Sequence, residues 1–360
     1  HVRISEKLQQ NMQYVDELMG LETNFDIIHR VIRLGDTDAC MYLIDGFCKD
    51  ELMQKILQYL MDLKAEDFPK DAHEMSKIAI PYVEVDLDDT WEKILGALLS
   101  GVFVLLLDGY EKAVLIDART YPARGVEEPD KDKVLRGSKD GFVETVVFNT
   151  ALIRRRIRST DLHMEMLNAG ENSRTDIVLC YMESRVDPKL LTQIRERIRS
   201  IQVDALAMNQ ESLAECLYQR KWYNPFPKFK YTERPDTAAA QVLEGNLVIL
   251  VDNSPSAMVL PTTIFDVVEE ADDYYFPPVT GTYLRLTRFL IALLTYFVTP
   301  TYLLLMNHRM WIPENLEFII LKEDPNVPLI LQFLLLELAI DGLRLAAVNT
   351  PNMLSTPLSV

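Results

Sequence analysis

The same order of apolar and polar positions occurs twice in this chain, 144 residues apart. Residues 98–118 read LLSGVFVLLLDGYEKAVLIDA and residues 242–262 read VLEGNLVILVDNSPSAMVLPT. Each stretch passes from a helical run to a glycine, an apolar run, a turn that starts with aspartate, and a second apolar run. Without a gap the two share six identities, among them Gly101 with Gly245 and Asp108 with Asp252. Each stretch is therefore predicted to be a helix end followed by a hairpin of two buried strands.

A weaker match precedes these hairpins and favours duplication over chance similarity. Residues 41–57 and 180–198 both have the pattern of a short strand, a polar turn and an amphipathic helix. Two stretches that match in the same order predict an α/β fold made of two similar subdomains. We expect the first subdomain at 1–140, a joining helix at 141–165 and the second subdomain at 166–284.

The last part of the chain, 285–360, has the pattern of a membrane domain. Residues 289–306 read FLIALLTYFVTPTYLLLM, which is eighteen residues without a charge. This length is at the short end of what a transmembrane helix needs, and membrane helices tolerate a proline such as Pro300. The alternative is a buried core helix.

A second apolar segment, at 328–348, carries three charged residues on one predicted helix face. Glu337, Asp341 and Arg344 are spaced at i, i+4 and i+7. Such a helix lines a polar cavity, packs against a partner, or lies in the membrane interface with its charges among the headgroups. A spanning helix followed by half of a membrane element indicates that only the start of an α-helical membrane domain is present.

Composition and the absence of catalytic motifs argue against two classes of function, nucleic-acid binding and catalysis. The 360 residues suggest two or three domains, and a net charge of −17 argues against general nucleic-acid binding. The four cysteines lack metal-site spacing, and no signal peptide is recognised, so we expect free thiols and a soluble part on the cytosolic side. The chain has no GxSxG, Walker, HExxH or GxGxxG motif. We therefore expect no enzyme, no catalytic residues, no cofactor and no metal.

Two segments have basic or aromatic character that permits a second interpretation. Arg154, Arg155, Arg156 and Arg158 lie within 141–162 and could form a patch for nucleic acid or anionic lipid. In so acidic a chain we favour a helix face whose arginines pair with acids of this chain or of a neighbouring copy. Residues 221–237, KWYNPFPKFKYTERPDT, could stack on single-stranded nucleic acid, but three prolines favour an irregular loop packed by its own aromatics.

Four ordered segments carry a resemblance to a known family: GFVETVVFNTALIRRRIRSTDL, YTERPDTAAAQVLEGNLVILVDNSP, PTTIFDVVEEADDYY and TYLRLTRFLIAL. Together they resemble the A-subunit family of spore germinant receptors, the GerA type, over nearly the whole chain. The family's motifs fall on Glu233, Arg234, Pro235 and Asp236, on Arg154, Arg155 and Arg156, on Pro300, and on Glu337, Asp341 and Arg344. Family members continue with more membrane helices after residue 360.

The resemblance implies a two-subdomain domain on the cytoplasmic, core side of the spore inner membrane, followed by a membrane domain. It implies a non-enzymatic role in germination with other membrane germination proteins, in a homo-oligomeric ring that conducts ions. On this interpretation Glu337, Asp341 and Arg344 line the pore, and the subunit or subdomain interface uses Arg154, Arg155, Arg156, Arg234 and Asp236. The alternative is a clamshell that senses a small solute between its two lobes; whether a ligand binds stays open.

Overall fold

The computed structural model describes residues 2–48, 50–82, 84–121, 140–203, 205–206, 208–218, 227–263, 266, 277–321 and 326–348. The chain forms two compact units, His1–Gly281 and Thr282–Val360, and each is treated by itself. Residues 122–139 of the predicted first subdomain, and 221–226 of the predicted aromatic loop, lie outside the described residues.

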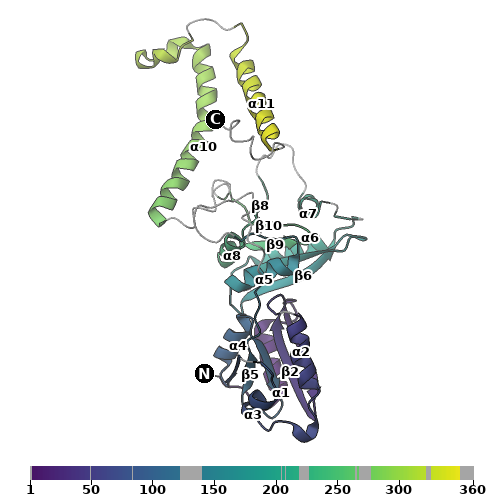
Figure 1. The fold of residues 1–360 in the computed structure, drawn as a ribbon. Coiled ribbons are helices and arrows are strands. Elements are labelled where there is room, and N and C mark those ends of the chain that lie inside the picture. The colour runs from purple at the N-terminus through teal and green to yellow at the C-terminus, as the bar shows by residue number, and fades with distance from the viewer. Residues whose placement is uncertain are drawn as a thin grey trace. The chain divides into compact units, whose positions relative to one another are not determined.

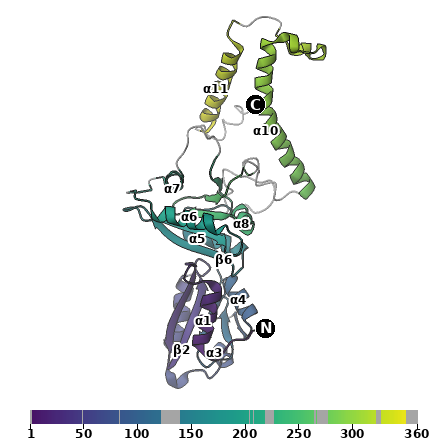
Figure 2. The same cartoon turned by 180° about the vertical axis from the view of Figure 1, so that it is seen from behind.

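The first sheet is antiparallel, in the order β1-β2-β4-β5-β3. Figure 1 labels two of its strands, β2 and β5. Its strands are β1 (Ile27–Leu34), β2 (Thr37–Ile44), β3 (Val85–Asp88), β4 (Phe103–Leu107) and β5 (Ala113–Ile116). One face packs on α1 (Leu8–Met19) and α4 (Trp91–Leu99), and α1 lies along the strands in Figure 2. The other face packs on α2 (Asp50–Met61) and α3 (Ala72–Ile78), and the 3-10 turn η1 (Ala65–Asp67) lies between these two helices in the chain. Alternate strand residues supply the two cores, as the two-residue period of a strand requires.

The second sheet has the same antiparallel order, β6-β7-β9-β10-β8. Its strands are β6 (Leu162–Ala169), β7 (Thr175–Met182), β8 (Lys230–Thr232), β9 (Leu247–Val251) and β10 (Ala257–Leu260). The helices α5 (Val146–Arg156) and α8 (Pro235–Leu243) cover one face, and α6 (Pro188–Arg199) and α7 (Gln210–Leu217) cover the other. The predicted α/β fold with two similar subdomains is therefore confirmed.

The duplicated pattern corresponds to duplicated structure. In both copies a helix ends, a glycine follows at nearly the same φ, +97° for Gly101 and +96° for Gly245, and two antiparallel strands come next. The matched aspartates also make the same contact, with the first backbone amide of a helix. Asp108 accepts a hydrogen bond from the Leu8 amide at 2.9 Å, and Asp252 accepts one from the Val146 amide at 3.1 Å.

Because each aspartate binds the first turn of a helix, the repeat also includes α1 and α5. The sequence pattern did not match these two helices to each other. Asn11 in α1 and Asn149 in α5 each exchange two hydrogen bonds with the backbone six residues upstream. The helix α5, within the segment 141–165 that was predicted to join the subdomains, is thus the first helix of the second repeat. The same segment also contains the start of β6.

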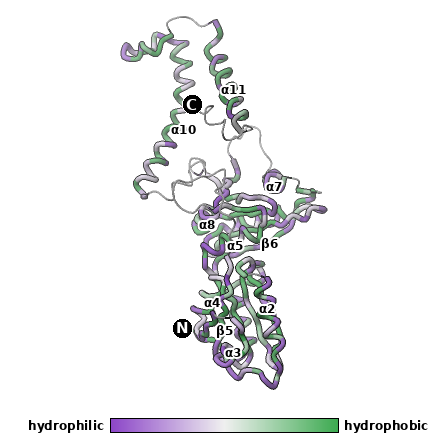
Figure 3. Tube along the Cα trace, in the orientation of Figure 1, coloured by the Kyte–Doolittle hydropathy of each residue, from purple (hydrophilic) through white to green (hydrophobic). Residues whose placement is uncertain are grey.

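The second unit contains all but the first turn of α10 (Pro278–Asn307), the short turns η3 (Arg309–Trp311) and η4 (Glu314–Ile319), and α11 (Leu329–Val348). In the described part, α10 is the one helix long and apolar enough to cross a membrane, and none of its apolar window is buried, which counts against a core helix. Figure 3 shows that both long helices are largely hydrophobic. Tyr302 of α10 meets Phe333 of α11 edge to face, with ring centres 6.2 Å apart.

Candidate functional site

A fully buried ion pair joins the two subdomains of the first unit. Arg154 of α5 is 0% exposed, and Asp26, just before β1, is 1% exposed. The guanidinium donates from Nε to Asp26 Oδ2 at 2.7 Å and from Nη2 to Oδ1 at 2.9 Å, and its Nη1 donates to the Leu162 carbonyl at 3.1 Å. Two parallel hydrogen bonds between charged groups are the strongest geometry available to such a pair.

The loop that carries Asp26 also binds the edge of the second sheet. The Phe25 amide donates to the Met164 carbonyl at 3.2 Å, and the Met164 amide donates to Asn24 Oδ1 at 2.6 Å. Asn24 is held in turn because its side-chain amide donates to the Met19 carbonyl at 2.6 Å. Met164 lies in β6, an edge strand, so the loop covers backbone groups that would otherwise be open to another chain.

Helix α5 contributes to the cores of both subdomains. Ala151 belongs to the first core, whereas Leu152 and Ile153 belong to the second. Gly46 approaches the helix so closely that a Cβ there would lie 3.1 Å from the Ala151 Cβ. A shared helix and a buried ion pair tie the two subdomains together at this junction.

His163 adds a titratable group to the junction. Its Nδ1 lies 2.9 Å from Thr23 Oγ1, and its ring stacks on Tyr181 with the centres 5.7 Å apart. Burial lowers the pKa of His163 from its usual 6.5, and the positive charge of Arg154 adds to this, against opposing effects of Glu183, Asp161 and Asp26. The folded protein therefore favours the neutral ring.

This pKa shift predicts a pH dependence of stability. Because the unfolded chain takes up the proton more readily, stability is full above pH 6.5 and is lost as the pH falls from there through the lowered pKa of the folded state. His163→Gln should flatten that part of the curve of unfolding free energy against pH. His73→Gln, at an exposed position on α3, is the control and should leave the curve unchanged. An unaltered curve in His163→Gln would remove the histidine from this role.

Of the other predicted interface residues, Arg156 and Arg234 form ion pairs, whereas Arg155 contacts a tyrosine ring. Arg156 pairs with Asp140 at 2.5 Å, and the fully buried Arg234 pairs with Asp236 at 2.7 Å at the start of α8. The predicted pairing of the basic run with acids of this chain is thus confirmed for Arg154 and Arg156. Arg155 instead places its guanidinium carbon 4.2 Å from the centre of the Tyr121 ring.

The charged residues of α11 are all exposed in the second unit. Arg344 Nη1 lies 3.9 Å from Asp341 Oδ1, one helical turn away, so the structure brings these two together. Glu337 lies one turn before Asp341 on the same helix. Among the described residues, no group of three or more His, Cys, Asp or Glu side chains is placed to hold a metal ion.

Sequence reasoning missed Asp26, Asn24 and Tyr121. One signal for Asp26 exists, because an aspartate precedes the first strand of both repeats. The Asp26 carbonyl accepts from the Asp45 amide at 2.8 Å, and the Asp161 carbonyl accepts from the Glu183 amide at 2.9 Å. No signal in the sequence indicates that Arg154 is the partner of Asp26.

Comparisons of the sequence with known proteins identify the family of this chain. The profile described as "Bacillus/Clostridium GerA spore germination protein" matches residues 13–360. The chain is 37% identical over 361 residues to Stage V sporulation protein AF of Bacillus subtilis (strain 168), covering all of this chain and 73% of that protein. It is 30% identical over 365 residues to the uncharacterized membrane protein YfkQ of the same organism, covering 99% and 70%.

A solved structure agrees with the fold. The crystal structure of the N-terminal domain of the A subunit of the Bacillus megaterium spore germinant receptor GerK3 superimposes with a TM-score of 0.56 and 26% identity. The match covers 73% of this chain and 98% of that one. The resemblance seen in the sequence is thus confirmed, and the chain belongs to the GerA family of spore germination proteins.

Proposed function

We propose that the chain is a membrane subunit of a spore germination complex and that copies of it assemble into a ring that forms or gates an ion-conducting channel. The family and the similarity to a germinant-receptor A subunit support the role in germination. The candidate span α10 and the membrane protein among the relatives support a membrane location. In this proposal the first unit lies on the core side of the spore inner membrane, and other germination proteins are partners.

The observation that carries the channel is the charged stripe on α11. An ionised carboxylate in hydrocarbon costs about 2.5–3.5 kcal/mol or more, so Glu337 and Asp341 are not expected to face lipid. Arg344 lies close enough to Asp341 to offset one of the two charges. In a ring of copies the remaining carboxylates surround the axis, where such rings attract cations and repel anions.

Ion flux through the reconstituted full-length protein tests this proposal. Glu337→Gln with Asp341→Asn should reduce cation conduction or cation-over-anion selectivity while assembly is retained. Glu314→Gln with Glu317→Gln in η4 is the control, because it removes the same charge outside the helix stripe. Unchanged flux and selectivity in the α11 variant, with normal insertion, would favour an interfacial helix whose charges contact headgroups.

The second candidate is a solute sensor, which the two similar α/β subdomains favour. A clamshell closes by bending between its lobes, and the shared helix α5 and the buried pair of Arg154 with Asp26 stiffen that connection. An open groove of about 410 Å³ lies between β1 and α2 in the first subdomain, but Asp50 and Asp62 line it together with Arg30, so its charge does not favour an anionic solute. A monomer that binds a solute tightly would favour this candidate over the channel.

A further inference from the structure

Two arginines of the basic run have no acidic partner among the residues that the structure describes. Arg155 and Arg158 are exposed, and in the described part of the chain neither lies within ion-pair distance of a carboxylate. This contrasts with Arg154 and Arg156, which both have acidic partners. In a chain with 54 acidic and 37 basic residues, two neighbouring unneutralised arginines are an unusual local charge.

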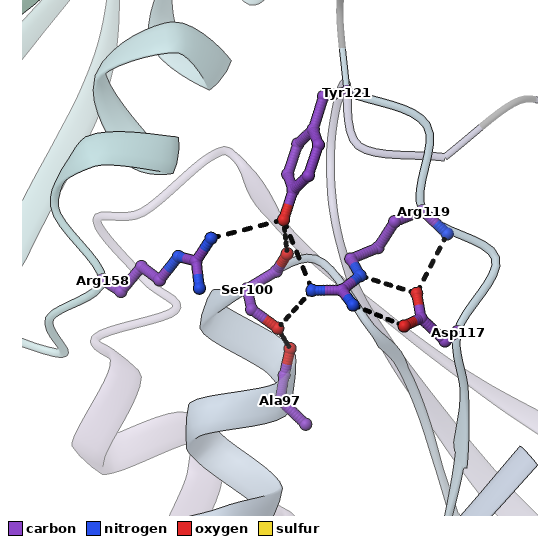
Figure 4. Close-up of polar contacts among 6 residues, drawn as sticks. All are labelled: Ala97, Ser100, Asp117, Arg119, Tyr121 and Arg158. Atoms are coloured by element: carbon purple, nitrogen blue, oxygen red, sulfur yellow. Dashed lines mark hydrogen bonds and ion pairs between the residues drawn. The ribbon is translucent and has the colours of Figure 1, made fainter. Parts of the chain in front are cut away.

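Both arginines are arranged around one tyrosine. The guanidinium of Arg155 lies over the Tyr121 ring, and Arg158 Nη2 donates to the Tyr121 hydroxyl at 3.4 Å. That hydroxyl donates to the Ser100 carbonyl at 3.0 Å, which fixes the ring (Figure 4). We name Arg155, Arg158 and Tyr121 the arginine–tyrosine cluster.

A third guanidinium supports the cluster without adding net charge. Arg119 donates to Asp117 from Nε at 2.6 Å and from Nη2 at 2.5 Å, and its Nη1 donates to the Tyr121 hydroxyl at 3.3 Å. The tyrosine and Arg119 come from the first subdomain, and Arg155 and Arg158 come from the second. Because the junction holds these groups in place, less side-chain freedom is lost when a ligand binds.

The chemistry of the cluster selects an anionic partner. A guanidinium binds carboxylate and phosphate groups through two parallel hydrogen bonds. Nucleic acid carries a charge at every phosphate and needs a wider basic surface than the two arginines of the cluster provide. A contact with a few carboxylates on a protein surface fits two positive charges better, and another copy of this acidic chain offers many such carboxylates.

We propose that the arginine–tyrosine cluster binds an acidic surface of a second copy of this chain. The inference rests on the proposed oligomer and assigns one of its contacts. A basic cluster on one copy that meets an acidic surface elsewhere on the next copy is a heterologous contact, and such contacts close into a ring when the rotation between copies permits it.

The test is the assembly of the full-length protein in detergent, measured as molar mass against protein concentration at low and at high salt. Arg155→Glu with Arg158→Glu should weaken association by about 30-fold or more, the equivalent of the smallest loss expected at a charged contact of this kind. Lys112→Glu with Lys189→Glu makes the same charge change at two exposed positions outside the cluster and should have little effect. Thermal unfolding of each variant checks that the fold is retained.

A photo-cross-linking residue at position 158 identifies the partner. We expect a product that joins two copies, with the linked peptide rich in aspartate or glutamate. A cross-link to phospholipid alone would overturn the inference in favour of an anionic membrane surface. If the wild-type protein assembles and the arginine changes have no effect, the proposed contact is overturned but the proposed channel is not. If the wild-type protein is monomeric, both the contact and the channel are overturned.

Discussion

Asp26→Ala is expected to lower the free energy of unfolding of the 1–281 unit by about 3–5 kcal/mol. The change leaves the guanidinium of Arg154 buried without its counter-ion, and nothing in the described surroundings supplies another carboxylate at this distance. Removing one partner of a buried pair costs more than the pair itself contributes, because the remaining charge stays out of water. Equilibrium unfolding in urea measures the loss.

Two further variants separate the pair from its surroundings. Arg154→Met with Asp26→Leu should recover most of the stability, since an apolar replacement of both partners leaves no uncompensated charge. Asp38→Ala removes an exposed partner of Arg33, whose side chain is 69% exposed, and should change stability by less than about 1 kcal/mol. A loss in Asp26→Ala no larger than that of Asp38→Ala would show that the buried pair is not a structural requirement.

Gly101→Ala and Gly245→Ala are each expected to destabilise the protein by about 2–5 kcal/mol, the sum of backbone strain and overpacking. Both glycines have φ near +97°, which L side chains rarely adopt. A Cβ would lie 2.7 Å from the Phe47 ring at position 101 and 2.9 Å from the Arg185 carbonyl oxygen at position 245. Similar losses at both positions would show that the repeat is maintained by the same backbone requirement.

Two other glycines provide matched controls. Gly109 has φ +82°, but no atom lies within 4 Å of the place a Cβ would occupy, so Gly109→Ala should cost only the strain, about 1–2 kcal/mol. Gly96 lies exposed in α4 with an ordinary φ and open space, so Gly96→Ala should stabilise the protein by about 0.5–1 kcal/mol. If Gly101→Ala costs no more than Gly109→Ala, the contact with Phe47 relaxes and overpacking plays no part.

The hairpins could be predicted because their requirements are local. A glycine with positive φ and an aspartate at the turn are fixed by chemistry within a few residues, so Gly101 with Gly245 and Asp108 with Asp252 persist in both copies. The equivalence of α1 and α5 could not be predicted in this way. A helix needs only an apolar face, and the carboxylate that binds its first turn comes from at least a hundred residues away.

The candidate site was predicted only in part, for a related reason. The basic run suggested a charged helix surface, yet Arg154 is buried because the helix turns that one side chain toward Asp26, 128 residues earlier in the chain. Nothing near Tyr121 in the sequence indicates that arginines from the next subdomain surround it. The apolar run 289–306 marked the segment that can cross hydrocarbon, but α10 begins at Pro278 because polar residues continue a helix that the apolar pattern does not include.

The buried pair also has a consequence for biosynthesis. Every strand of the first sheet precedes Arg154 in the chain, so the ribosome delivers the whole sheet before the counter-ion of Asp26 exists. Until α5 emerges, that carboxylate must keep its hydration and the loop beside it must stay open to water. The arrival of α5 expels this water and closes the loop against β6. A nascent chain that stops short of residue 154 lacks the partner of Asp26 and is thus expected to keep this loop accessible to proteases.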